Sequence, residues 1–336
     1  MIRIDGSFGE GGGQILRTAI SLSCITLKPV EIFNIRANRP KPGLAAQHLK
    51  GIEAAKLITR AEVEGLKLGS TKIVFKPKNL KGGSFKIDIG TAGSVTLILQ
   101  TILLPSLMAE NPSLFEIKGG TDVKWSPTVD YVKNITLKAL KKLNANIKIE
   151  LIRRGYYPKG GGLIKVEVKN SKLKGFEFEV VREKIRGLSH CLNLPKHVAE
   201  RQADAAMEFL KEKGYEAEIA IEFGKGFSTG SGITLWSGYK GGSSLGEKGK
   251  RAEVVGKEAA IEIVSELESK ACFDKHLADQ VLPFAVVCKG NTRYTTSKIT
   301  KHLISNAYVI EKFFKNTIKI DESKKEVKIK GAFESI

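Results

Sequence analysis

Cysteine is scarce in this chain, and its few cysteines follow no metal-binding or disulfide pattern. There are 4 in 336 residues, and no pair has the spacing of a CxxC motif. We therefore expect neither a zinc site nor a disulfide framework, and we predict reduced, mostly buried thiols. The cysteines are Cys24, Cys191, Cys272 and Cys288.

Long apolar runs are also missing. No stretch approaches the roughly 20 apolar residues that cross a bilayer, and the chain reaches a turn at Gly6 before a signal-peptide run can form. We therefore expect a cytoplasmic protein without a membrane partner. Several common catalytic motifs are absent too, since the chain has no P-loop, no GxGxxG fingerprint and no HExxH pair.

Positive charge is what the chain has in excess. Lys and Arg number 55 against 36 Asp and Glu, which gives a formal net charge of +19. Lysine and arginine bind phosphates with release of counterions, so the imbalance favours an anionic partner. A lysine-rich solvated surface is the alternative explanation, and charge alone does not decide between them.

An internal repeat organises the first half of the chain. Ile35 and Ile117 occupy matching places in two strand, polar turn and helix blocks, an offset of about 82 residues. The helices are predicted at residues 45–57 and 129–143, and a glycine-rich turn with an apolar helix precedes each block. Alternating strands end each unit, so the sequence predicts a mixed α/β fold of two helices and about four strands per unit.

A third unit is interrupted by an insertion. The apolar helix that begins at Leu277 resembles the core helix of another unit, whereas residues 181–270 alternate strand and helix in a different pattern. We predict strands from residue 184 and at 217–222 and 232–237, with helices at 197–213 and 252–270. The expected division is a large domain of residues 1–180 and 271–336 and an inserted domain of residues 181–270.

Two segments near the N-terminus suit an anion. Residues 10–17 (EGGGQILR) form a glycine-rich turn before a helix, where backbone N–H groups and the helix dipole favour negative charge. Arg36, Arg39 and Lys41 lie in a stiff turn that leads to Gln47 and His48, an arrangement suited to a polyphosphate or an RNA end. Ordinary turn punctuation and a solvated basic loop remain the alternatives.

Carboxylates mark two further places. Asp122 and Asp130 lie near a turn, where they could bind a divalent metal or cap a helix, and capping is the commoner use. Asp279 and Gln280 stand in an apolar helix, where neither is a comfortable core residue. They either face a cleft or form a hydrogen-bonded structural pair.

Among the 5 histidines, His302 has the most distinctive setting. A polar cluster precedes it at the start of an amphipathic helix, where the dipole disfavours the protonated imidazole. A neutral imidazole is what a nucleophile requires. His276 is a second candidate because it lies only three residues before Asp279.

These segments, in this order, resemble the RNA 3′-terminal phosphate cyclase family over nearly the whole chain. The matching segments are residues 5–6 (DG), 9–17 (GEGGGQILR), 36–48, 90–94 (GTAGS) with Gln100, 119–122 (GGTD), 157–162 (YPKGGG), 195–201 (PKHVAER), 277–280 (LADQ) and 302–306 (HLISN). The resemblance implies a large domain of three repeated units with an inserted domain of thioredoxin-like topology.

The resemblance also implies a reaction. ATP transfers AMP to a histidine, AMP passes to an RNA 3′-phosphate to give RNA(3′)pp(5′)A, and the 2′-OH closes a 2′,3′-cyclic phosphate. By motif position His302 is the nucleophile. Arg36, Arg39 and Gln47 are implied for substrate phosphate, and Glu10 for a divalent metal, Mg or Mn. The nucleotide pocket is implied to comprise Gln14, Arg17, Gln100, Asp279 and Gln280.

The expected partners are therefore ATP and RNA with a 3′-phosphate end, and a homo-oligomer is one option for the assembly. The nearest rival interpretation is a cyclase-like ribosome-biogenesis protein of the same fold without the adenylated histidine. An enolpyruvyl transferase is more distant, since its six-unit layout needs a longer chain and has no place for the insertion.

Overall fold

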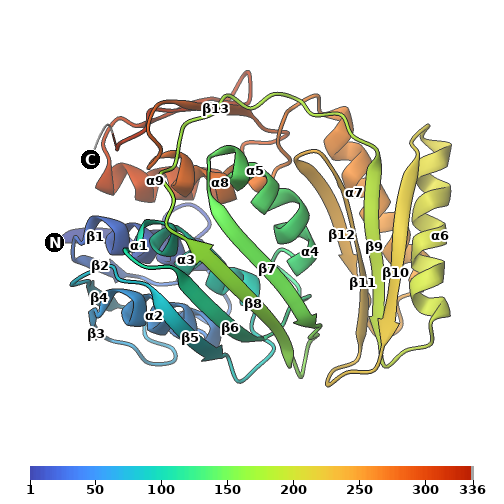
Figure 1. Cartoon of the computed structure of the whole chain (residues 1–336), viewed down its shortest axis with the longest axis horizontal. Helices are drawn as coiled ribbons and strands as arrows, with labels where there is room; N and C mark the ends of the chain where they lie inside the picture. The colour runs from blue at the N-terminus through green and yellow to red at the C-terminus, as the bar shows by residue number, and fades with distance from the viewer. Residues whose placement is uncertain (334–336) are drawn as a thin grey trace.

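The computed structural model describes residues 1–333 and shows a mixed α/β fold, as the sequence predicted (Figure 1). The first sheet has the order β1-β2-β4-β3, and the second repeats this arrangement as β5-β6-β8-β7. In each sheet the first two strands are parallel and the other pairs are antiparallel. The bounds are β1 (Ile2–Asp5), β2 (Val30–Phe33), β3 (Glu62–Glu64), β4 (Ile73–Lys76), β5 (Gly83–Asp88), β6 (Ser113–Gly119), β7 (Asn146–Arg153) and β8 (Gly162–Lys169).

The third sheet holds three strands, β13-β15-β14, where the repeat predicted about four. Its missing first strand is supplied by the segment that leaves β8: Lys174 and Glu177 form isolated parallel bridges to Lys289 and Arg293. This segment thus lies beside β13 as β1 lies beside β2. The strands are β13 (Thr292–Thr295), β14 (Ile318–Asp321) and β15 (Glu326–Ile329).

Apolar helices join these three sheets in one core. α3 is buried around almost its whole circumference, as expected for a helix with few polar residues. α1 packs against α2, α3 and α9, and α8 packs against α9. The bounds are α1 (Gly13–Thr26), α2 (Ala46–Thr59), α3 (Val95–Met108), α4 (Val129–Tyr131), the π-helical turn η1 (Val132–Thr136), α5 (Leu137–Lys142), α8 (Leu277–Ala285) and α9 (Lys301–Phe313).

A fourth sheet, of order β10-β9-β11-β12, occupies the right of Figure 1. Helices α6 and α7 cover one of its faces and share a second apolar core with it, whereas β11 also contacts α4. The division into two independently folding domains stays a prediction. The bounds are β9 (Ile185–Leu192), α6 (His197–Glu212), β10 (Ala217–Gly224), β11 (Gly230–Ser237), β12 (Lys240–Leu245) and α7 (Ala252–Glu268).

Strand β12 was not predicted, because its sequence KGGSSL reads as a loop. The strand needs its glycines for close packing. A Cβ on Gly242 would lie 2.4 Å from the carbonyl oxygen of Ala259 in α7, and one on Gly241 would lie 2.4 Å from Ile135. Glycine therefore lets this strand pack closely against α7 and η1, although glycine itself has low β propensity.

None of the helices within residues 1–333 has the length and apolar character needed to cross a membrane.

Candidate active site

The glycine-rich turn before α1 places Glu10 between two other predicted site residues. One oxygen of its carboxylate accepts a hydrogen bond from the Arg39 guanidinium. The other, Oε2, lies 2.8 Å from Nε2 of His302. Residues that lie 29 and 292 positions from Glu10 in the sequence thus form one cluster, which we call the His302 cluster and which also includes Arg17.

Close packing explains why the turn is made of glycine. Gly11 has a φ of +59°, which favours glycine, and α1 begins immediately afterwards at Gly13. A Cβ on Gly13 would lie 2.3 Å from Nε2 of His48. The turn therefore brings backbone, histidine and arginine groups within contact of one another.

His302 stands in the first turn of α9. Thr300 caps this helix, its Oγ1 accepting a hydrogen bond from the backbone N–H of Leu303 at 3.1 Å. Burial lowers the pKa of His302 and, although Glu10 opposes this, the positive charges of Arg17 and Arg39 lower it further. The side chain is nevertheless 40% exposed, so a neutral imidazole is accessible to a substrate.

His276 is in a different electrostatic state. Its Nε2 lies 3.5 Å from the Glu262 carboxylate. Burial alone would lower the pKa of His276, but the hydrogen bond with Glu262 and the charge of Asp274 raise it. The pKa of His276 is therefore shifted in the opposite direction to that of His302, and the choice of His302 as nucleophile stays a prediction.

Asp279 lies inside the protein and ties three helices together. Its Oδ2 accepts a hydrogen bond from Nε2 of Gln14 at 2.6 Å, and its backbone carbonyl accepts one from Asn306 at 2.8 Å. Asn306 Oδ1 in turn accepts a hydrogen bond from the Thr18 hydroxyl at 2.6 Å. Burial raises the pKa of Asp279 to about 7, even though His276, Gln14 and Arg17 favour its ionised form.

Arg17 and Gln100 meet across the contact between α1 and α3. The Arg17 Nε donates to Oε1 of Gln100 at 2.9 Å. Burial lowers the pKa of Arg17 to about 10, and the charges of Asp279 and Glu10 partly oppose the effect. The guanidinium is therefore a fixed cation beside the His302 cluster.

Three predicted residues have partners outside that cluster. Arg36 donates to the carbonyl oxygen of Gly43 at 2.7 Å and so stiffens its own loop. Gln47 accepts a hydrogen bond from the backbone N–H of Ser94, at the start of α3, at 3.0 Å. Gln280 accepts one from the Thr136 hydroxyl at 2.9 Å, whereas its neighbour Asp279 bonds to α1.

Two residues that the predicted set omitted also belong to this region. His48 is buried, its Nδ1 accepts a hydrogen bond from the Ala45 N–H at 3.1 Å, and burial lowers its pKa to about 3. Asn306 links α9 to α1 and α8. The spacing of Asn306 four residues after His302, on the same face of the helix, could have indicated its role.

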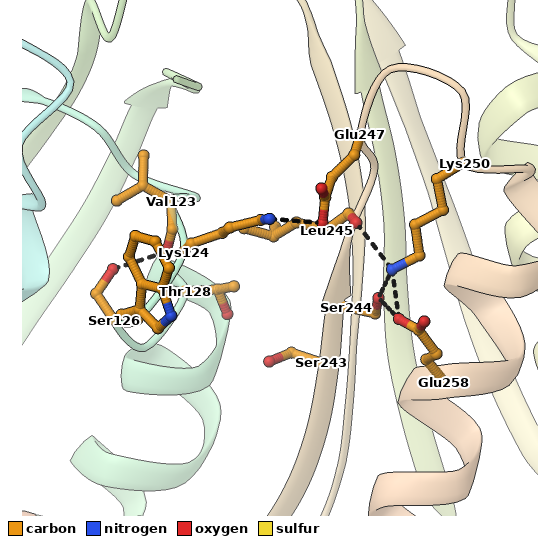
Figure 2. A pocket seen from close by; sticks show the side chains of 11 residues that line it. Val123, Lys124, Ser126, Thr128, Ser243, Ser244, Leu245, Glu247, Lys250 and Glu258 are labelled. Atoms are coloured by element: carbon orange, nitrogen blue, oxygen red, sulfur yellow. Dashed lines mark hydrogen bonds and ion pairs between the residues drawn. The ribbon is translucent and has the colours of Figure 1, made fainter. Parts of the chain in front are cut away.

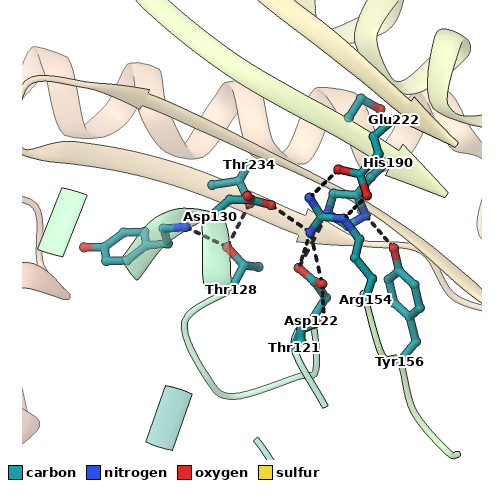
Figure 3. A network of polar contacts seen from close by, with 12 residues as sticks. Thr121, Asp122, Thr128, Asp130, Arg154, Tyr156, His190, Glu222 and Thr234 are labelled. Atoms are coloured by element: carbon teal, nitrogen blue, oxygen red, sulfur yellow. Dashed lines mark hydrogen bonds and ion pairs between the residues drawn. The ribbon is translucent and has the colours of Figure 1, made fainter. Parts of the chain in front are cut away.

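A second polar cluster joins the second sheet to the fourth (Figure 3). Nη1 of Arg154 lies 2.8 Å from Asp130 and 3.2 Å from Asp122, and its Nε lies 2.8 Å from Glu222. His190, whose Nδ1 is 2.6 Å from the Tyr156 hydroxyl, completes what we call the Arg154 cluster. Asp122 and Asp130 therefore form ion pairs, while Thr128 caps α4, which corrects the capping expectation for the two carboxylates.

The two clusters differ in their fit to a divalent metal. Asp122, Asp130 and His190 are close enough to bind one, but both carboxylates are buried and already form ion pairs with the Arg154 guanidinium. Glu10 is partly exposed, and a single carboxylate that works with substrate phosphates is a usual protein contribution to Mg²⁺ binding. Access to solvent distinguishes Glu10 from the buried Asp122 and Asp130, but Glu10 is itself paired with Arg39 and His302, so its assignment as metal ligand stays a prediction.

A pocket of about 260 Å³ lies between the loop around Trp125 and the end of β12 (Figure 2). Its rim carries an ion pair of 2.8 Å between Lys124 and Glu247, and Lys250 pairs with Glu258. None of the predicted site residues lines it.

A histidine held with a carboxylate and fixed arginines suits chemistry on phosphate groups, because fixed cations offset phosphate charge. The chain belongs to the RNA 3′-terminal phosphate cyclase family, whose sequence model matches residues 8–320. The predicted membership and enzyme status are both confirmed, and membership of this family excludes the enolpyruvyl transferase interpretation.

Proteins named RNA 3′-terminal phosphate cyclase are close relatives. The Archaeoglobus fulgidus protein is 63% identical over 96% of this chain and 99% of its own. The Pyrococcus furiosus protein is 52% identical over 94% of this chain and 93% of its own. Among solved structures, an EPSP synthase from Acinetobacter baumannii is 12% identical, with a TM-score of 0.30 over 98% of this chain and 65% of that one, which is too weak to carry an argument.

Proposed function

We propose that this enzyme uses ATP to convert an RNA 3′-terminal phosphate into a 2′,3′-cyclic phosphate through AMP bound covalently to His302. The observation that carries the proposal is the placement of His302, accessible and flanked by Glu10, Arg39 and Arg17. The names of the relatives give the reaction class, and the arrangement of this cluster supports the proposed mechanism.

The first step forms a bond from Nε2 of His302 to the α-phosphorus of ATP, while the bond from that phosphorus to the bridging oxygen breaks and pyrophosphate leaves. Nε2 must carry its lone pair, so the imidazole proton resides on Nδ1 and the contact with Glu10 is released. The lowered pKa of His302 favours this neutral form.

The later steps reuse the same cations. An oxygen of the RNA 3′-phosphate attacks the α-phosphorus, the P–N bond breaks, and the histidine regains its lone pair. The 2′-OH then attacks the 3′-phosphorus, loses its proton, and AMP departs. Arg17 and Arg39 offset the charge that builds up during these transfers, and Arg36 stiffens the loop that presents Arg39.

The remaining site residues are proposed to contact the nucleotide, the substrate phosphate or the metal. Gln14, Gln100, Asp279 and Gln280 are proposed to line the nucleotide pocket with Arg17, and Gln47 to position the substrate phosphate. Glu10 would hold the divalent metal, Mg or Mn, which when bound neutralises charge on the phosphates.

Incubation with α-labelled ATP and divalent metal tests the proposal. The wild-type protein should take up label that acid removes and hydroxide does not, as expected for a phosphoramidate. His302→Ala should lose both the label and RNA cyclisation while it stays folded. The control is His276→Ala, which should retain the label.

The rival interpretation predicts another outcome. A cyclase-like protein without an adenylated histidine would bind RNA but take up no AMP. Normal labelling of His302→Ala would contradict the proposal as well.

A further inference from the structure

Two aromatic rings stack beside the His302 cluster. The ring centroids of Phe8 and Tyr308 are 4.0 Å apart, with planes inclined by 15°. Phe8 is 39% exposed, although one face of its ring is covered by Tyr308. Part of the Phe8 side chain that Tyr308 does not cover is therefore open to solvent.

The chain holds this stack close to the site of chemistry. Phe8 precedes Glu10 by two residues, so their Cα atoms are at most about 7 Å apart. The intervening Gly9 lies against α9, since a Cβ there would come within 2.6 Å of the Ser305 hydroxyl. Tyr308 also belongs to α9, the helix that carries His302.

Hydrogen bonds and one lysine hold the stack in place. Lys312 lies 5.0 Å from the Tyr308 ring centroid on the ring face. The Tyr308 hydroxyl lies 3.4 Å from the backbone N–H of Asp5, which anchors the inner ring. Asn38 donates to the Ser7 carbonyl at 3.2 Å and ties the turn to the basic loop that carries Arg39. The Tyr308 ring is thus fixed, and the partly exposed Phe8 ring lies in a turn that Asn38 ties to the basic loop carrying Arg39.

We propose that the Phe8–Tyr308 stack is a subsite for the base of the RNA's 3′-terminal nucleotide. This proposal rests on the proposed function, because the terminal phosphate must reach His302. An exposed aromatic face beside cations is how proteins hold single-stranded nucleic acid, and stacking accepts any base. A 3′-phosphate that attacks AMP on His302, beside Glu10, brings its own base within reach of Phe8.

Phe8→Leu tests the proposal, since leucine keeps an apolar side chain on Tyr308 but removes the aromatic face. The kcat/KM for cyclisation of a short 3′-phosphorylated RNA should fall about fivefold to 100-fold, mainly through KM, with AMP labelling by ATP alone unchanged. Phe8→Trp should restore it. The control is Phe223→Leu in β10, because Phe223 is also exposed and has Lys196 over its ring at 5.6 Å.

An RNA that lacks its 3′-terminal base sharpens the test. The proposal predicts that Phe8→Leu and wild type use this RNA equally. With an RNA that instead lacks the base three positions from the 3′ end, the difference between the two proteins should remain. Unchanged kcat/KM in Phe8→Leu would overturn the proposal, and so would an equal loss of AMP labelling, which indicates a structural role. If the wild type takes up no AMP, the proposed function fails, and direct binding of the RNA to both proteins still decides the stacking.

Discussion

The molecule contains two clusters built from the same kinds of side chain. The His302 cluster joins a histidine, a carboxylate and two arginines, and the Arg154 cluster joins a histidine, three carboxylates and one arginine. The His302 side chain is 40% exposed and that of His190 is 1% exposed. The kinds of side chain in a cluster are therefore a poor guide to its reactivity. The proposed active site differs from the Arg154 cluster in that its histidine is accessible and its arginines outnumber its carboxylate.

The charge balance points the same way. Three carboxylates surround the guanidinium in the Arg154 cluster, so no positive charge is left there for a phosphate. In the His302 cluster two guanidinium groups accompany the Glu10 carboxylate, which leaves net positive charge for an anionic substrate. We therefore expect the Arg154 cluster to stabilise the fold and the His302 cluster to carry the chemistry.

The largest expected effect on stability comes from Arg154→Met. This change leaves the buried carboxylates of Asp122 and Asp130 without a partner, so the free energy of unfolding should fall by about 3–5 kcal/mol in urea titrations. Arg201→Met is the control, because Arg201 pairs with Glu253 at the surface, and it should leave the urea midpoint nearly unchanged. Equal losses would contradict the distinction between the clusters.

Arg39→Ala should have the opposite profile. Loss of a cation that faces the transferred phosphate should slow cyclisation by about 10²–10³-fold with little change in the urea midpoint. Lys141→Ala removes an exposed charge from the end of α5 and should stay within about threefold of wild type. Similar slowing in both variants would mean that Arg39 contributes only to a diffuse basic surface.

The pH dependence of stability tests the buried environment of His190. Burial and the charge of Arg154 lower the pKa of His190 to about 3 from an unfolded value near 6.5. The unfolded chain gains this proton first, so the contribution of His190 is complete above pH 6.5 and falls as the pH drops toward 3. Wild type should lose about 1–2 kcal/mol more than His190→Asn between pH 6.5 and 5. Parallel curves for the two proteins would show that His190 does not titrate in this way.

The smallest effect is expected at the cap of α9. Thr300→Ala removes the acceptor for the Leu303 N–H and should cost about 1 kcal/mol of stability, whereas Thr300→Ser should recover most of it. Thermal unfolding measures the difference. No recovery by serine would show that the threonine methyl group, and not the cap, is responsible.

Hydrophobic periodicity predicted most elements of the fold to within a few residues. The helix expected at residues 45–57 is α2 (Ala46–Thr59), and that at 252–270 is α7 (Ala252–Glu268). The helix expected at 129–143 is present but contains the π-helical turn η1, which periodicity does not reveal. Strand β12 was missed because glycine has low β propensity, and its glycines are there to allow close packing against neighbouring elements.

Sequence reasoning was weaker for contacts between distant segments. The pairing of Asp122 and Asp130 with Arg154 depends on how the second sheet folds back on itself. The residues next to the two aspartates in the sequence do not indicate this pairing. The stack of Phe8 on Tyr308 likewise joins the two ends of the chain. The roles of the site residues, the division into domains and the cytoplasmic location stay predictions.

Identification of the adenylated residue tests the central claim most directly. The protein is incubated with ATP and Mg²⁺ or Mn²⁺, digested under mildly basic conditions that preserve a phosphoramidate, and its peptides are sequenced by mass spectrometry. The account predicts one AMP-modified peptide, with the modification on His302 in the first turn of α9. AMP on His276 or on a lysine, or no modified peptide in a protein that cyclises RNA, would contradict it.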